Sequence, residues 1–351
     1  MNIFELLEKA VQMKASDLHI TVASPPVVRV NGSLIRLNEP SLYPQDTLSL
    51  AKQLMNEEQQ RRFEKFGEID FSYSTPQVGR FRINIYKQRG SCALAIRVVN
   101  IRIPSLTELG FPECLKELAM KPRGLILVTG PTGSGKSTTL ASMIDYINHH
   151  KTCHIITLED PIEYLHKHDK SIINQREIGS DSLNFHNALK AAFREDPDVI
   201  MVGEMRNLET IATVITAAET GHLVMSTLHT IGAANTIDRI IDVFPPHQQQ
   251  QVRVQLSMVL EGIISQQLLP RKDGEGRIVA YEILLVTSAI RNQIREGKTH
   301  QIQNSIQTGA RLGMKTMDAS LGDLVRRGLI TREAAYEYAI SQEMLERFIN
   351  M

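Results

Sequence analysis

Apolar residues recur along the first hundred positions with two different spacings. Residues 3–13 carry them on one helix face, and residues 46–66 also show a helical pattern. Short runs of apolar and polar residues around these segments predict strands, with hairpin turns at Asn31-Gly32 and at 88–91. Residues 1–100 are therefore predicted to form a mixed α+β domain with antiparallel pairing. Its predicted strands are 18–22, 27–30, 33–37, 80–86 and 93–99.

Proline and glycine interrupt the pattern over residues 101–123. The segment contains one short helical stretch, and its punctuation is typical of a chain that leaves regular structure. We interpret it as a linker or hinge between two domains, although a surface loop followed by a helix would give the same pattern. The interrupting residues are Pro104, Gly110, Pro112 and Pro122.

The apolar pattern changes after residue 123. Short, solidly apolar runs now alternate with segments of helix length, which is typical of a parallel sheet buried on both faces. Residues 124–351 are therefore predicted to form an α/β domain. From about residue 247 the pattern is mostly helical, apart from a strand pair around 277–285. The four predicted parallel strands are 125–129, 154–158, 198–202 and 222–226.

Composition and charge narrow the range of functions. A length of 351 residues suggests about two domains. Lys+Arg 39 and Asp+Glu 39 give a formal net charge of zero, which argues against a protein whose main task is to bind the nucleic-acid backbone. The N-terminal stretch lacks a signal-peptide pattern, and no apolar run reaches the about 18 residues of a membrane span. We therefore expect a cytosolic or peripheral protein.

The cysteines point to a reducing compartment. They are widely spaced and include no CxxC pair, so neither a disulfide framework nor a zinc ribbon is expected. The three are Cys92, Cys114 and Cys153.

The segment from Gly130 to Thr138 spells GPTGSGKST and matches G-x-x-x-x-G-K-[ST] between a predicted strand and a predicted helix. Glycines let successive backbone N–H groups turn inward around an anion, and the helix N-terminus adds its dipole. Lys136 suits the β- and γ-phosphates, and the Ser137 hydroxyl suits Mg²⁺. The sequence therefore predicts that ATP and Mg²⁺ bind here. The predicted binding residues are Pro131, Thr132, Gly133, Ser134, Gly135, Lys136, Ser137 and Thr138.

A carboxylate follows the predicted strand 198–202. In the run DVIMVGE, Gly203 takes the usual position of the Walker B aspartate, so Glu204 must supply the carboxylate. A carboxylate at the end of a strand next to a phosphate loop can orient or deprotonate water. We predict this role for Glu204. A solvated loop glutamate is the alternative.

Two further groups lie beside predicted strands. Glu159, Asp160 and Glu163 follow 154–158, with a proline between them, and could point at one metal or water site; a charged surface turn would look the same. His222 and His229 bracket the run LVMSTL. His229 lies at a strand's carboxyl end, where open α/β sheets bind their ligands. A structural histidine fits this pattern equally well.

Four segments occur in an order that resembles one family. GPTGSGKST, TLEDPIEY, REDPDVIMVGEMRNLET and TAAETGHLVMSTLHT are similar to the Walker A, Asp box, Walker B and His box of the secretion ATPases that drive type II and type IV secretion and type IV pili. The resemblance covers nearly the whole chain, from Ser16-Asp17-Leu18-His19 onward. It implies a hexameric ring of Mg²⁺-dependent ATPase subunits. Each would have an N-terminal α+β PAS-like domain followed by a RecA-like P-loop ATPase domain with a helical C-terminal region.

Residue roles follow from the same resemblance. It implies that Arg82 and Arg97, on paired strands of the first domain, are arginine fingers, because a fixed and permanently charged guanidinium can neutralise charge on the γ-phosphate. Without the resemblance, both would be ordinary strand-surface arginines. The other implied roles are the Walker lysine for Lys136, the catalytic glutamate for Glu204, Asp-box acids for Glu159 and Glu163, and His-box residues for His222 and His229.

One C-terminal segment bears on which member of the family this is. Residues 289–297, AIRNQIREG, are similar to the AIRNLIRE motif of the pilus retraction ATPases, with Gln293 in place of leucine; a generic amphipathic helix is the alternative. An accessory retraction ATPase of similar length lacks that motif. Extension and type II secretion ATPases usually carry an extra N-terminal domain and a tetracysteine zinc insertion. Three scattered cysteines cannot form that zinc site.

The resemblance therefore favours a motor for type IV pilus retraction. It implies a homohexamer in the cytoplasm, peripheral at the inner face of the membrane, acting on an inner-membrane platform protein and working with a paralogous accessory ATPase but with no nucleic acid. The alternatives are a pilus assembly or type II secretion ATPase, a RecA-like nucleic-acid motor, and a regulatory subunit that binds ATP with little hydrolysis.

Overall fold

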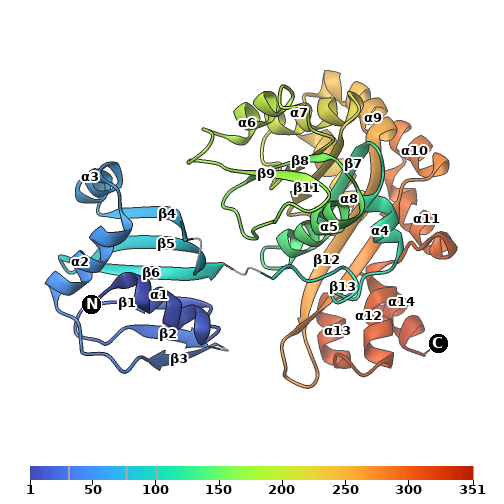
Figure 1. Cartoon of the computed structure of the whole chain (residues 1–351). Coiled ribbons are helices and arrows are strands. Elements are labelled where there is room, and N and C mark those ends of the chain that lie inside the picture. Colours follow the sequence, from blue (N-terminus) through green and yellow to red (C-terminus); the bar gives the residue numbers. More distant parts are fainter. Residues whose placement is uncertain (31, 76–77, 100–101, 351) are drawn as a thin grey trace. The chain divides into compact units, whose positions relative to one another are not determined.

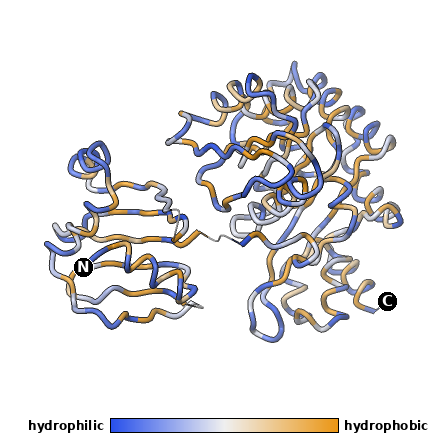
Figure 2. The backbone as a smooth tube through the Cα atoms, viewed as in Figure 1, coloured by the Kyte–Doolittle hydropathy of each residue, from blue (hydrophilic) through white to orange (hydrophobic). Residues whose placement is uncertain are grey.

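The computed structural model describes residues 1–30, 32–75, 78–99 and 102–350, and the chain forms two compact units (Figure 1). The first comprises Met1–Arg102 with Glu163–Leu165, and the second comprises Ile103–Ile162 with His166–Met351. Figure 2 shows apolar residues concentrated along the strands and polar residues on the outer turns of the helices. Each unit therefore has its own core.

The first unit is an antiparallel sheet with helices packed on one face. Its strand order is β3-β2-β1-β6-β5-β4. Alternate residues of the central strands, such as Phe81, Ile83 and Ile96, are fully buried against apolar residues of the helices. The elements are α1 (Ile3–Gln12), β1 (Asp17–Ile20), β2 (Val27–Val30), β3 (Ser33–Arg36), α2 (Pro44–Leu54), α3 (Glu57–Phe66), β4 (Glu68–Thr75), β5 (Gly79–Gln88) and β6 (Ser91–Val99).

Most predictions for this unit are confirmed, with two differences. The helical segment 46–66 is two helices, because the backbone at Met55 is extended and Asn56 caps α3 by accepting a hydrogen bond from the Gln59 N–H. Strand β4 was not predicted, since its exposed face is polar. The hairpin at 88–91 is confirmed: Arg89 and Gly90 both have positive φ, as a two-residue hairpin turn requires. The other predicted turn falls on Asn31, outside the described residues.

The second unit is built on a mostly parallel sheet of order β13-β12-β7-β11-β10-β8-β9. Only β13 runs antiparallel to its neighbour. The strands are β7 (Gly124–Thr129), β8 (His154–Glu159), β9 (Ile172–Glu177), β10 (Val199–Val202), β11 (Leu223–Leu228), β12 (Leu260–Pro270) and β13 (Arg277–Leu285). The predicted α/β class and its four parallel strands are thereby confirmed, with ends shifted by one or two residues.

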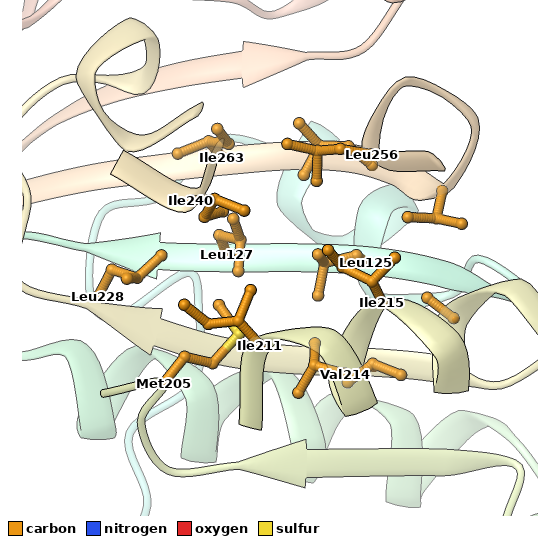
Figure 3. Close-up of a cluster of buried hydrophobic side chains, with 14 of the residues drawn as sticks. Leu125, Leu127, Met205, Ile211, Val214, Ile215, Leu228, Ile240, Leu256 and Ile263 are labelled. Carbon is orange, nitrogen blue, oxygen red and sulfur yellow. The ribbon is translucent and has the colours of Figure 1, made fainter. Parts of the chain in front are cut away.

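Helices cover both faces of this sheet, which explains why its central strands are apolar throughout. On one face, Leu125 and Leu127 of β7 pack with residues of α7, α8 and α9 (Figure 3). On the other face, Ile126 and Val128 pack with α4 and α5. The helices are α4 (Cys114–Ala119), α5 (Lys136–His150), α6 (Phe185–Ala192), α7 (Leu208–Glu219), α8 (Ala233–Asp242), α9 (Pro246–Val259), α10 (Ser288–Arg295), α11 (Ile302–Thr308), α12 (Met317–Arg326), α13 (Arg332–Tyr338) and α14 (Gln342–Asn350).

Two strands of this sheet were not predicted. Residues 260–270 lie in the region expected to be helical but form β12, which pairs with β7 in parallel and with β13 in antiparallel register. Strand β9 lies at the edge of the sheet and has the mixed sequence IINQRE, so no apolar run marked it. The predicted helical C-terminus is otherwise confirmed: α12, α13 and α14 pack on the far ends of β12 and β13.

Most of the predicted linker 101–123 belongs to the second unit. Residues 100 and 101 lie outside the described residues, and the unit boundary falls between Arg102 and Ile103. From there Leu106, Phe111 and Leu115 are buried in the core that also holds α5. The structure therefore places the boundary at the start of the predicted linker, because its apolar residues pack on the sheet.

Candidate functional site

The phosphate loop joins β7 to α5 and has the backbone of an anion-binding turn. Gly130, Gly133 and Gly135 have φ of 141°, 80° and 89°, a region that glycine adopts without strain. The Lys136 ammonium lies over the loop and donates hydrogen bonds to the carbonyls of Gly130 (2.9 Å) and Pro131 (3.0 Å). The loop thus ends at the N-terminus of a 15-residue helix, whose dipole favours negative charge.

Strand β12 packs directly against this loop. A Cβ on Gly130 would lie 2.2 Å from the carbonyl oxygen of Gln266, so only glycine fits there. The Gln266 side chain donates a hydrogen bond to the Ser134 carbonyl (2.7 Å) and accepts one from the Thr139 hydroxyl (2.9 Å). Gln266 was not predicted as part of the site, because its strand was expected to be a helix. The available signal was the polar run Ser265-Gln266-Gln267 within an apolar stretch.

Glu204 lies at the same edge of the sheet as the phosphate loop. It follows β10, and β11 alone separates β10 from β7. Its carboxylate is 14% exposed and contacts Nε of Arg206 at 2.5 Å and Nε2 of His229 at 3.5 Å. His229 follows β11, the strand between the two. Because these strands are parallel, their carboxyl ends place the loop, His229 and Glu204 at one edge of the sheet, in that order across it.

Gly203 explains why the carboxylate comes one residue later than in the usual Walker B pattern. A Cβ at this position would lie 3.2 Å from the Leu158 carbonyl oxygen and 3.5 Å from the Glu159 Cα. The Gly203 N–H donates to the Leu158 carbonyl, and its own carbonyl accepts from the Thr227 hydroxyl (2.6 Å). The backbone is held between two strands, with little space for a side chain.

The predicted acidic group of 159, 160 and 163 does not converge. Glu159, at the end of β8, is 8% exposed and accepts hydrogen bonds from Thr157 (2.6 Å) and Gln175 (3.1 Å). Asp160 and Glu163 are exposed, and Glu163 clusters with the first unit. Within 1–30, 32–75, 78–99 and 102–350, no three His, Cys, Asp or Glu side chains are arranged to hold a metal ion. The suggestion of one three-carboxylate metal site was therefore wrong.

His222 lies at the opposite edge of the sheet from His229. It precedes β11, and its carbonyl accepts a hydrogen bond from Gly124, the first residue of β7. Its ring contacts the Ala217 carbonyl at 3.0 Å and packs near Phe193. Within one copy of the chain, His222 therefore does not join the phosphate loop, because only the residue after a parallel strand reaches the carboxyl edge.

Arg82 and Arg97 are neighbours on the sheet of the first unit. They lie directly opposite each other on β5 and β6, so both project from the same face. Arg82 forms a bidentate ion pair with Asp70 (2.7 Å for the shorter contact), and Nε of Arg97 lies 3.2 Å from Asp17. Their side chains are 44% and 71% exposed. The two side chains are thus exposed on the same face of this sheet.

No helix among the described residues has the length and apolar character needed to cross a membrane.

Comparison with known proteins agrees with this geometry. The family described as "Type II/IV secretion system protein" matches residues 2–336. The "Type IV pilus retractation ATPase PilT" of Pseudomonas aeruginosa is 50% identical over 339 residues, covering 97% of this chain and 98% of that protein. A "Twitching motility protein" of Neisseria gonorrhoeae is 48% identical over 98% of this chain and 92% of its own.

A solved structure described as the pilus retraction motor PilT with bound ADP has a TM-score of 0.93 and 52% identity, covering 99% of both chains. The α/β fold is thus shared over nearly the full length of the chain. The chain belongs to the type II/IV secretion system protein family.

Proposed function

We propose that this protein is the ATP-hydrolysing motor of type IV pilus retraction, the activity behind twitching motility. The observation that carries the proposal is full-length similarity to retraction ATPases in sequence and in fold. A P-loop domain alone would indicate only nucleotide binding, because folds are shared among functions. Here the similarity extends over both units, since it covers 97% of this chain in sequence and 99% in structure.

ATP is the proposed substrate, held on the phosphate loop. The inward backbone N–H groups and Lys136 would bind the β- and γ-phosphates. The hydroxyls of Thr129 and Ser134 are buried beside the loop and, in the described part of the chain, have no hydrogen-bond partner, as expected of a site built for a polar ligand. Ser137, in the first turn of α5, would be the ligand to Mg²⁺, which when bound neutralises phosphate charge.

Glu204 is proposed to orient the attacking water and accept its proton. A general base must be held in one orientation within reach of its proton. The contacts with His229 and Arg206 hold the two carboxylate oxygens of Glu204. We propose that His229, at the end of β11, senses whether the γ-phosphate is present. Glu159, fixed by Thr157 and Gln175 at the next strand, is proposed to support the same edge.

The first unit is proposed to be the PAS-like domain and the second the RecA-like ATPase domain. Arg82 and Arg97 would close over the phosphates as the first unit turns about the short connection between Val99 and Ile103. Contacts with the γ-phosphate are lost at hydrolysis, so closure would depend on the nucleotide. In this way ATP hydrolysis would drive a movement of the first unit. Glu163 and His222 keep roles assigned by resemblance alone.

The assembly is proposed to be a homohexamer at the inner face of the cytoplasmic membrane. Its motion would pass to an inner-membrane platform protein, with a paralogous accessory ATPase as a further partner. Sites completed by residues from a neighbouring copy would make hydrolysis depend on ring formation.

The test is steady-state ATPase activity measured against protein concentration, with the oligomer sized in parallel. We expect activity to rise as the hexamer forms and to ignore added single- or double-stranded DNA. Activity in the monomer would contradict sites completed between subunits. Strong stimulation by DNA would replace the pilus motor with a nucleic-acid motor.

A further inference from the structure

Two neighbouring residues of β12 contact the two loops that flank the proposed ATP site. Ser265 and Gln266 point to opposite faces of the sheet, as successive strand residues must. Gln266 lies on the face covered by α5, and Ser265 on the face covered by α8. Both are almost completely buried, at 0% and 1% exposure. Buried polar side chains in a central strand are unusual unless they bind specific partners.

The Gln266 side chain packs against the phosphate loop and forms hydrogen bonds with it. Its amide joins the middle of the loop to the first turns of α5: Nε2 donates to the Ser134 carbonyl, and Oε1 accepts from the Thr139 hydroxyl. A Cβ on Gly135 would lie 3.2 Å from the same Nε2, so the loop backbone packs directly on the amide. A side chain with a donor and an acceptor in fixed positions can therefore hold the loop in one conformation.

Ser265 holds the segment that follows His229. Its hydroxyl accepts a hydrogen bond from the Gly232 N–H (2.9 Å). The residue opposite Ser265 on β13 is Glu282, which is 0% exposed and accepts from the Ala233 N–H at 2.8 Å. These are the first N–H groups of α8, which have no partner inside the helix. Three residues after His229, the backbone is thus fixed to β12 and β13.

Glu282 also contacts the C-terminal helical region. Its second oxygen lies 3.4 Å from Nε2 of Gln303 on α11. Burial raises the pKa of this carboxyl, and the hydrogen bonds from Ala233 and Gln303 oppose that rise. Each oxygen of the buried Glu282 carboxyl accepts a hydrogen bond. Glu282 therefore has a positioning role that an apolar residue would not fill.

We propose that Ser265, Gln266 and Glu282 are positioning residues that set the phosphate loop against the His229 segment. This inference rests on the proposed ATPase function. Gln266 fixes where the phosphates bind, and Ser265 with Glu282 fixes where His229 meets Glu204. Adjacent residues on one strand therefore act on different steps: one on nucleotide binding, the other on the chemical step.

The test is to separate affinity from turnover in single variants of the full-length protein. Equilibrium binding of a fluorescent ADP and MgATP turnover at saturating ATP are measured for each. Gln266→Leu should weaken ADP binding about tenfold and change kcat less than about threefold. Ser265→Ala and Glu282→Leu should lower kcat about tenfold and leave ADP binding unchanged. Glu282→Gln, whose amide still accepts from Ala233, should recover most of the lost turnover.

Gln267→Leu is the matched control, because the side chain of this neighbouring, buried glutamine makes no hydrogen bond within the described residues. It should leave both quantities near wild type. If all variants lower affinity and turnover together, in proportion to their melting temperatures, the residues are structural and the proposal is wrong. Wild-type affinity in Gln266→Leu would also overturn it. Absence of turnover in the wild-type protein would instead defeat the proposed function, while ADP binding would still test Gln266.

Discussion

At the scale of single residues, backbone geometry decides which group does the chemistry. Gly203 is held between the carbonyl of Leu158 and the hydroxyl of Thr227, so the first side chain free to face the loop is Glu204. From sequence position alone, we predicted that Glu204 supplies the carboxylate because Gly203 occupies the usual aspartate position. We did not predict His229 as the partner of Glu204, because their contact at 3.5 Å joins the ends of separate strands.

Glu204→Gln should leave nucleotide binding intact and abolish turnover. The amide keeps the size of the carboxylate but cannot accept a proton, so the expected loss of kcat is at least about 100-fold. Single-turnover hydrolysis and ADP affinity check this. Glu209→Gln, an exposed glutamate in the first turn of α7, is the control. Unchanged turnover in the Glu204 variant would remove this residue from the mechanism.

His166 should make the protein sensitive to mild acid. Burial lowers the pKa of this imidazole from 6.5 to about 4. The unfolded chain therefore takes up a proton between these values that the folded chain does not, so the free energy of unfolding falls as pH drops from 6.5 towards 4. At about 1.4 kcal/mol per pH unit, the loss is at most about 3.5 kcal/mol.

Denaturant titrations at pH 7 and pH 4.5 measure that loss. His166→Gln should show a smaller difference between the two pH values than the wild type. His247→Gln, which removes an exposed histidine, should not. An equal pH dependence in all three proteins would show that His166 does not titrate abnormally.

At the scale of elements, the prediction succeeded where a segment's partners were close in sequence or simply apolar. The core strands β7, β8, β10 and β11 are nearly solid apolar runs, so their burial on two faces could be predicted from the sequence. Strand β12 was not, because its polar residues bind partners far along the chain: Gln266 contacts Ser134 and Thr139. No local pattern carries that information.

The position of His222 was predictable from strand direction. In a parallel sheet, the residue before a strand lies at the amino edge and the residue after it at the carboxyl edge. The predicted strand 222–226 began one residue early, and this placed His222 in the strand itself. The observed strand begins at Leu223. The two histidines had been grouped because they bracket the run LVMSTL, and the family motif kept them together.

Helix α10 shows how a departure from a family pattern is accommodated. The Gln293 amide lies 3.0 Å from the Ser305 hydroxyl on α11, where a leucine would make only apolar contact. Gln293→Leu should therefore lower the free energy of unfolding by about 1 kcal/mol, the typical worth of a hydrogen bond. Turnover should stay within about twofold of wild type, because the contact is outside the ATP site.

A double-mutant cycle tests this pairing. Ser305→Ala should cost about as much as Gln293→Leu, and the double variant little more, because either change removes the same bond. Chemical denaturation gives all four values. Additive losses would show that the two residues stabilise the fold independently.

At the scale of the whole molecule, the proposed catalytic groups are divided between two units with separate cores. The phosphate loop and Glu204 belong to the second, and the arginine pair to the first. Lys136 and Glu204 were predictable because local motifs mark them. The proposed role of Arg82 and Arg97 came from the family resemblance alone, since nothing in their spacing sets them apart from surface arginines.

Arg82→Ala and Arg97→Ala should each reduce turnover on the order of 10³-fold, as the loss of an arginine finger does, with little loss of ADP affinity. Arg36→Ala, on the exposed edge strand β3 of the same sheet, is the control. Steady-state kinetics and ADP titration distinguish the outcomes. Near wild-type rates in both variants would show that the pair takes no part in hydrolysis.

The covalent connection between the units limits the stroke of such a motor. Strand β6 ends at Val99, and the second unit begins at Ile103. A fully extended chain gains at most about 3.6 Å per residue, so these two points are never more than about 14 Å apart. Because the connecting segment is so short, one unit cannot slide far along the other. In the proposed hexamer, we therefore expect large displacements of the first unit relative to the second to be rotations about this connection.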